Sequence, residues 1–246
     1  MDQLNKIILP QDELTYKYKG DPNISIGVLG MVDDNLAINE CGTGSVLKNS
    51  VINSFFETQR LSLSDEKSVV LHIGRKKCPK PCPKLRVHDS DMKTVNTARY
   101  LGDIISASGS LGPCIEDRRS KGWGKVADMT GILSEMPTDR RIEVGLKLRE
   151  AKIHNGILYN SEAWSNYSDK DMEKLEQVDM AAIRALMDGG HSKCPKAFYF
   201  LEFGTLMVRH LVMIRRLVHH RHILTRDESE MIRNRQKTHV KGIGLV

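Results

Sequence analysis

The pattern of hydrophobic and polar positions divides the chain into two unlike halves. Up to residue 106, short apolar runs alternate with turns, at 24–29, 69–73, 85–87 and 100–105. Runs of this length, rich in apolar and β-branched residues, are typical of strands. Between the first two, residues 45–61 place apolar side chains at helical spacing, which predicts a helix. The pattern therefore favours a small α+β layer over residues 1–106.

From about Pro113 onward the signals are helical. Pro113 suits the first turn of a helix, and Pro137 ends one helix and opens the next. Ser168 is a candidate N-cap for a helix running to about Met187, which the glycine pair at 189–190 would end. A further helix begins near Cys194-Pro195 and is interrupted at Gly204. These signals predict an all-helical region over residues 107–226.

The last predicted helix, residues 206–226, is amphipathic and carries no acidic residue. We expect its buried face to consist of Met207, Leu211, Ile214 and Val218, which are spaced by three or four positions. The opposite face would then present cations, among them Arg215 and Arg216. Residues 227–246 are polar and charged, and we expect a loosely held tail there.

Composition limits the classes of protein to consider. The chain has 246 residues, 40% of them hydrophobic, and a formal net charge of +6. This is enough apolar material for a core, and the positive charge permits a polyanionic partner. No apolar run approaches the ~18 residues needed to span a membrane, and the N-terminal stretch lacks the apolar core of a secretory signal. We therefore expect an intracellular protein without a membrane partner; the choice between nucleus and cytoplasm stays open.

The cysteines fit that compartment. There are five, an odd number scattered along the chain. This arrangement suits reduced thiols better than a disulfide framework. We expect no disulfide-linked partner.

Three basic segments are candidate nucleic-acid contacts. The first, residues 74–86, contains three prolines and no acid, which indicates an extended loop that could follow a phosphate backbone or could equally be a solvated hairpin loop. The second consists of Arg118, Arg119 and Lys121, just before Trp123. This tryptophan could stack on a base, but tryptophan more often packs in a core. The third is the acid-free helix at 206–226. Together they provide Arg75, Lys76, Lys77, Lys80, Lys84, Arg118, Arg119, Lys121, Arg215 and Arg216.

The sharpest local feature is a pair of adjacent acids, Asp33 and Asp34, between two apolar segments that can form a hairpin. Neighbouring side chains on a plain strand point to opposite faces, but at a tight turn they can converge. Two convergent carboxylates suit Mg²⁺, and paired metal ions can clamp a phosphoryl-transfer site. Taken alone, however, Asp-Asp-Asn is most often simply a turn.

The order of several motifs resembles the reverse transcriptases of non-LTR retrotransposons. Met31-Val32-Asp33-Asp34 is similar to their catalytic hairpin, and the segment at 61–74, with Lys67, is similar to the palm segment that follows it. Arg99-Tyr100-Leu101-Gly102 is similar to the primer grip. Three later runs resemble the helical thumb and the region beside it: KGWGKVADMTGIL, LKLREAKIHNGILYNSEAW and LEQVDMAAIRAL.

The resemblance implies an RNA-directed DNA polymerase, a nucleotidyltransferase that copies an RNA template onto a DNA primer from dNTPs with two Mg²⁺ ions. Asp33 and Asp34 would bind the metals, and Lys67 would act as an acid toward the leaving group. Tyr100, Leu101 and Gly102 would hold the primer end. The domains expected are a partial palm at 1–106, a thumb-like bundle at 107–226 and a tail at 227–246.

The resemblance is incomplete before the hairpin. That family carries a further catalytic aspartate on an earlier palm strand, together with the fingers, whereas only 32 residues precede Asp33 here. We therefore expect the C-terminal portion of such a polymerase, truncated at its N-terminus and inactive alone. Two alternatives stay open: a nucleic-acid-binding module without chemistry, and a protein-interaction fragment with exposed apolar surface.

Overall fold

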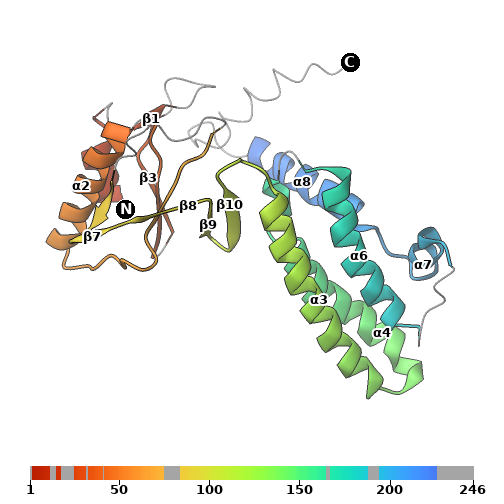
Figure 1. The fold of residues 1–246 in the computed structure, drawn as a ribbon. Helices are drawn as coiled ribbons and strands as arrows, with labels where there is room; N and C mark the ends of the chain where they lie inside the picture. The colour runs from red at the N-terminus through yellow and green to blue at the C-terminus, as the bar shows by residue number, and fades with distance from the viewer. Residues whose placement is uncertain are drawn as a thin grey trace. The chain divides into compact units, whose positions relative to one another are not determined.

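The computed structural model describes residues 2–11, 15–17, 25–31, 33–40, 42–74, 84–164, 167–187 and 194–225. The chain forms two compact units, which are treated separately below (Figure 1). Unit 1 comprises residues 1–102, 106–109 and 223–246, and unit 2 comprises residues 103–105 and 110–222. The domain boundary expected after residue 106 lies in the segment where the chain passes between the units. The glycine pair at 189–190 and the tail lie outside the described residues.

Unit 1 is mixed α and β. Its helices are α1 (Asp2–Ile8) and α2 (Gly42–Thr58), and the second confirms the helix predicted at 45–61. Its strands are β1 (Tyr16–Lys17), β2 (Ser25–Ile26), β3 (Val28–Met31), β4 (Asp34–Ala37), β5 (Val69–Leu71), β6 (Arg86–Val87), β7 (Ser90–Asp91), β8 (Lys93–Val95) and β9 (Thr97–Tyr100). The following strand, β10 (Asp103–Ser106), leads into unit 2.

The strands do not build the continuous sheet layer that the sequence suggested. In the described part of the chain they pair only two by two: β1 with β2, β3 with β4, β5 with β8, β6 with β7 and β9 with β10. The β5–β8 pair is parallel, with Val69 opposite Lys93. The single run expected at 100–105 is wrong as one strand, because Leu101 and Gly102 turn the chain there. Both have positive φ, 47° and 82°, as a two-residue hairpin turn requires.

A small hydrophobic cluster holds the N-terminal helix against the hairpin of unit 1. Leu4 and Ile8 of α1 are fully buried beside Val28 of β3, and Phe55 and Phe56 of α2 pack against them. The two phenylalanine rings meet edge to face with centroids 5.8 Å apart. This cluster places both helices on the β3–β4 hairpin.

Unit 2 is helical apart from its short β-strand entry. Its helices are α3 (Gly112–Ser134), α4 (Thr138–Leu148), the π-helix η2 (Arg149–His154), α5 (Asn155–Ile157), the 3-10 helix η3 (Ser161–Ala163), α6 (Asp169–Ala185), α7 (Lys196–Glu202) and α8 (Val208–Leu224). No described helix is long and apolar enough to cross a membrane. The two cysteines described, Cys114 and Cys194, are free thiols.

Several predicted helix ends are confirmed. Pro113 lies in the first turn of α3, and Pro137 is the N-cap of α4. Ser168 caps α6 in a capping box, in which its side chain accepts from the Asp171 amide and the Asp171 carboxylate accepts from the Ser168 amide. Gly204 follows α7 with φ 58°, a left-handed conformation that suits glycine.

The core of unit 2 lies between α3 and α6. Gly122 of α3 allows this close approach, since a Cβ there would lie 2.7 Å from Ile157 and 2.8 Å from Val178. Trp164 is buried, as expected for a packed residue, whereas Trp123 is 41% exposed and does not belong to the core. The buried apolar residues include Ile115, Met129, Leu133, Ile153, Leu175, Val208 and Val212.

The buried face predicted for the last helix is confirmed only in part: Leu211 and Met207 are partly buried against hydrophobic clusters of unit 2. Val208 and Val212 are fully buried, whereas Ile214 and Val218 are 45% and 62% exposed. The reason is that apolar residues surround most of this helix, so spacing alone selects no single face. The exposed apolar residues of α8 are Met213, Ile214, Leu217, Val218 and Leu224.

Candidate functional site

The acid pair occupies the tip of the β3–β4 hairpin, and the predicted hairpin is confirmed. The register pairs Met31 with Asp34 and Val28 with Ala37, so Asp34 is the first residue of β4 and Asp33 precedes it in the turn. Both aspartates are exposed. In the described residues, no group of three or more His, Cys, Asp or Glu side chains is close enough to hold a metal ion. Carboxylates are the ligand type that Mg²⁺ prefers, but the described residues bring no third carboxylate, histidine or cysteine to this pair.

Two polar side chains that the sequence analysis missed hold the base of this hairpin. Lys48 of α2 is only 1% exposed, and its ammonium group donates to the carbonyls of Gly27 (3.1 Å) and Ile38, one on each side of the hairpin. Burial lowers the pKa of Lys48 from 10.5 to about 8. Lys48 therefore links both ends of the hairpin to α2.

The side chain of Asn5 in α1 makes two hydrogen bonds to the backbone of β3, as a neighbouring strand would. Its amide nitrogen donates to the Val28 carbonyl at 3.0 Å, and its amide oxygen accepts from the Val28 N–H at 2.9 Å. Gly27 makes this contact possible, because a Cβ there would lie 2.6 Å from the Asn5 oxygen. The N–H and carbonyl of Val28 are thereby both hydrogen-bonded.

The residues predicted as a primer grip form the β9–β10 turn. Tyr100 ends β9, and Leu101 and Gly102 are the turn residues. Burial raises the pKa of Tyr100, and the negative charge of Asp34 adds to this shift. The Asp34 carboxylate and the Tyr100 phenol are therefore within electrostatic range of each other in unit 1.

Of the other predicted site residues of unit 1, the structure describes Lys67 and Lys84. Lys67 lies in an exposed turn before β5, with no hydrogen bond or ion pair to Asp33 or Asp34 within the described part of unit 1. Lys84 forms an exposed ion pair with Asp91 at 3.3 Å. The remaining cations of that loop, Arg75, Lys76, Lys77 and Lys80, lie outside the described residues.

The three cations of α3 that were predicted as nucleic-acid contacts each form an ion pair with an acidic side chain. Arg118 is 6% exposed and forms an ion pair with Asp103, so this structure leaves it no access to a phosphate. Arg119 pairs with Glu116 at 2.8 Å and Lys121 with Asp117 at 2.7 Å. Arg118 therefore contributes to the packing of unit 2, while Arg119 and Lys121 form ion pairs at the surface of α3; their predicted contact with nucleic acid stays a prediction.

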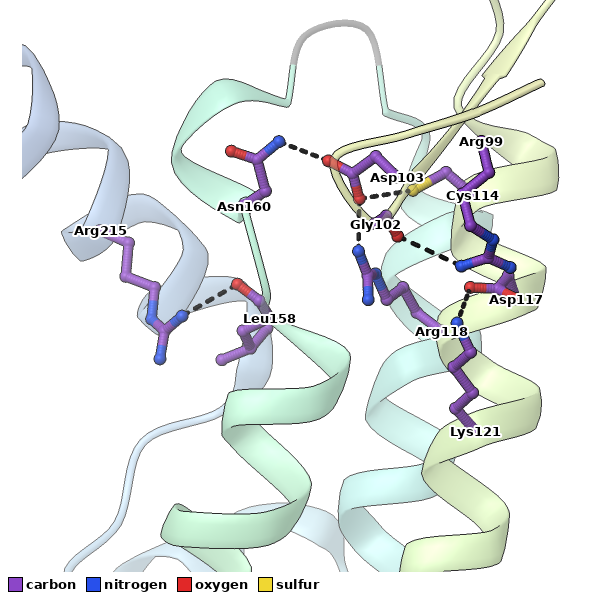
Figure 2. A network of polar contacts seen from close by, with 10 residues as sticks. All are labelled: Arg99, Gly102, Asp103, Cys114, Asp117, Arg118, Lys121, Leu158, Asn160 and Arg215. Atoms are coloured by element: carbon purple, nitrogen blue, oxygen red, sulfur yellow. Dashed lines mark hydrogen bonds and ion pairs between the residues drawn. The ribbon is translucent and has the colours of Figure 1, made fainter. Parts of the chain in front are cut away.

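Asp103 is the centre of a polar network in unit 2. Its carboxylate accepts from Arg118, from the Cys114 thiol at 3.4 Å and from the Asn160 amide (Figure 2). Burial raises the pKa of the Cys114 thiol, which is 2% exposed. Asn160 has φ 58°, a left-handed conformation that asparagine tolerates better than most residues. The network fixes the turn after α5 against the start of α3.

The two arginines predicted on α8 differ in their surroundings. Arg215 donates to the Leu158 carbonyl at 2.9 Å and reaches the turn after α5 (Figure 2). Arg216 donates to the Tyr167 hydroxyl at 3.1 Å and lies 5.5 Å from the centre of that ring. Both keep donors beyond these contacts, because a guanidinium carries five N–H groups.

Comparison with protein-family models, curated proteins and solved structures gave no match. The functional argument therefore depends on the residues and their arrangement.

Proposed function

We propose that this chain is part of an RNA-directed DNA polymerase of the reverse-transcriptase type. Its β3–β4 hairpin would supply two of the carboxylates that bind Mg²⁺. The observation that carries the proposal is the hairpin register, in which Met31 opposite Asp34 leaves both aspartates exposed at the tip. The order of the later motifs and the electrostatic interaction of Asp34 with Tyr100 support it.

In this proposal each residue has a defined task. Mg²⁺, when bound, would reduce the cost of bringing a nucleophile to a negatively charged phosphate. Asp33 and Asp34 would hold the metal through oxygen ligands. The turn at Leu101 and Gly102 would support the primer end beside Tyr100. Lys67, which is exposed in the turn before β5, would donate a proton to the leaving pyrophosphate.

The first test is metal binding by the hairpin. We expect Mn²⁺, a stand-in for Mg²⁺, to bind the chain, and Asp33→Asn or Asp34→Asn each to weaken this binding roughly tenfold through loss of one charged ligand. Electron paramagnetic resonance of free Mn²⁺ measures the affinity. Asp65→Asn, which removes an exposed acid elsewhere in unit 1, is the matched control. Equal Mn²⁺ affinities for the hairpin variants and the control would contradict the proposal that Asp33 and Asp34 bind the metal.

The second test is catalysis. We expect the isolated chain to extend no primer on an RNA template with Mg²⁺ and dNTPs, because two carboxylates are an incomplete two-metal site. A gel assay with a labelled primer measures this. Metal-dependent extension that Asp33→Ala abolishes would show that the chain is an active polymerase, contrary to this expectation.

A second candidate function is nucleic-acid binding without chemistry. It is favoured by α8, which carries no acid and whose Arg215 and Arg216 have further guanidinium donors beyond their contacts with Leu158 and Tyr167 among the described residues. Binding that weakens linearly in log–log plots against salt, and that survives Asp33→Ala and Asp34→Ala, would distinguish this function from metal-dependent transfer.

A further inference from the structure

Unit 2 contains an open hollow of about 310 Å³ beside the turn that follows α5. Its lining residues come from two parts of the unit: Asn155, Tyr159, Asn160 and Glu162 from the segment around the turn, and Arg215 from α8. All five residues belong to unit 2, whereas the β3–β4 hairpin belongs to unit 1. It is thus a second candidate site with its own chemistry.

The walls of the hollow are held by contacts already in place. Asn160 is bound to Asp103, and Arg215 is bound to the Leu158 carbonyl at 2.9 Å (Figure 2). The Arg118 guanidinium lies 4.8 Å from the centre of the Tyr159 ring, and this tyrosine is still 47% exposed. The hollow therefore offers an aromatic surface that a neighbouring cation already orients.

The two charged side chains that line the hollow, Arg215 and Glu162, do not form an ion pair with each other. No hydrogen bond or ion pair engages Glu162 within the part of the chain that the structure describes. A guanidinium fork and a carboxylate that do not meet can face two edges of one ligand. Such a ligand must provide acceptors toward Arg215 and donors toward Glu162.

A ligand with acceptors for Arg215 and donors for Glu162 can be sought among the chemical groups of a nucleic acid. A phosphate has acceptors only, so Glu162 would repel it. Guanine has both: O6 and N7 accept from an arginine fork, and its N1–H and 2-amino group can donate to a carboxylate. An exposed tyrosine ring can stack on an unpaired base, as single-strand-binding proteins use aromatic residues.

We propose that this hollow binds an unpaired guanine of a nucleic-acid strand. Arg215 contacts O6 and N7, Glu162 accepts from N1–H and the 2-amino group, and the Tyr159 ring stacks on the base. The proposal rests on nucleic acid being a partner of the chain, but it requires neither the metal nor Asp33 and Asp34.

The test uses the full chain in EDTA and fluorescein-labelled oligodeoxythymidines that carry one central base. Fluorescence anisotropy compares guanine, inosine, which lacks the 2-amino group, and 7-deazaguanine, which lacks N7. We expect guanine to bind about tenfold more tightly than either analogue, because each analogue lacks one hydrogen bond to a charged side chain.

Two variants assign the contacts. Glu162→Met, which removes both acceptor oxygens, should abolish the preference for guanine over inosine and keep the preference over 7-deazaguanine; Arg215→Met, which removes the donors, should do the reverse. Glu135→Met and Arg140→Met, at exposed positions of unit 2 outside the hollow, should change neither preference. Circular dichroism establishes that each variant is folded.

The remaining outcomes are also decisive. Binding with equal affinity for all three bases would overturn the guanine site while leaving nucleic acid as a partner. No binding to any oligonucleotide would overturn both the site and the second candidate function, and the Mn²⁺ experiment would still decide on the hairpin.

Discussion

Replacing Asp179 by alanine is expected to lower the free energy of unfolding of unit 2 by about 3–5 kcal/mol, the usual cost of removing one partner of a buried ion pair. Asp179 of α6 is fully buried, and its carboxylate accepts two hydrogen bonds of 2.7 Å from Arg149 and one of 2.9 Å from His154. The alanine variant would leave a buried guanidinium without its counter-charge. Urea unfolding followed by circular dichroism measures the loss.

Lowering the pH should also reduce the free energy of unfolding of unit 2, as Asp179→Ala does. Burial raises the pKa of Asp179, but the hydrogen bonds and charges of His154 and Arg149 outweigh it, so the net pKa is below the usual 3.8. The unfolded state then takes up a proton first as the pH falls. The stabilisation is present above the ordinary carboxyl pKa and is lost below it.

Two controls separate the ion pair from simple loss of a side chain. Asp128→Ala, at an exposed position of α3, should change stability little. The double variant Arg149→Leu with Asp179→Leu should recover much of the loss, because apolar residues often replace a buried pair at little cost. If Asp179→Ala unfolds at the same urea concentration as the wild type, the network does not stabilise unit 2.

This network also shows why part of the fold escapes prediction from sequence. Helix ends with local signals, such as Ser168 and Pro137, are predictable because the determining residues are adjacent in sequence. Arg149 and His154 are five positions apart, which in an α-helix of 3.6 residues per turn places them ~140° apart. The π-helix, whose hydrogen bonds link residues five apart, brings both onto one face toward Asp179. That distortion depends on α6, which is distant in sequence.

The candidate site also contains features that are predictable from adjacent residues and features that depend on residues distant in sequence. The hairpin at Asp33 and Asp34 is predictable because its two strands are adjacent in the chain and end at a turn. The roles of Asn5 and Lys48 are not, because their partners lie 23, 21 and 10 residues away. One signal was present for Lys48: it is the sole charged residue of α2 before Glu57. A single cation in an uncharged helix is a candidate for a buried, backbone-bonded role.

Lys48→Met should remove a pH dependence of stability that the wild type shows above pH 8. The pKa of Lys48 is about 8 when folded and 10.5 as the ordinary value. Between these values the unfolded state binds more protons than the folded state, so the free energy of unfolding rises with pH. Because methionine cannot titrate, wild-type stability should rise relative to the variant by about 2–3 kcal/mol from about pH 7 to about pH 10.

Urea unfolding of both proteins across this pH range gives the difference directly. Titrating groups common to both cancel in it, as does the constant cost of leaving the Gly27 and Ile38 carbonyls without their donor. Lys93→Met, at an exposed position of β8, controls for the loss of a lysine as such and should show no comparable rise. A flat difference for Lys48→Met would mean that its ammonium group is not held in the buried position between the two ends of the hairpin. A rise would make α2, through Lys48, a determinant of how firmly the Asp33–Asp34 hairpin is held.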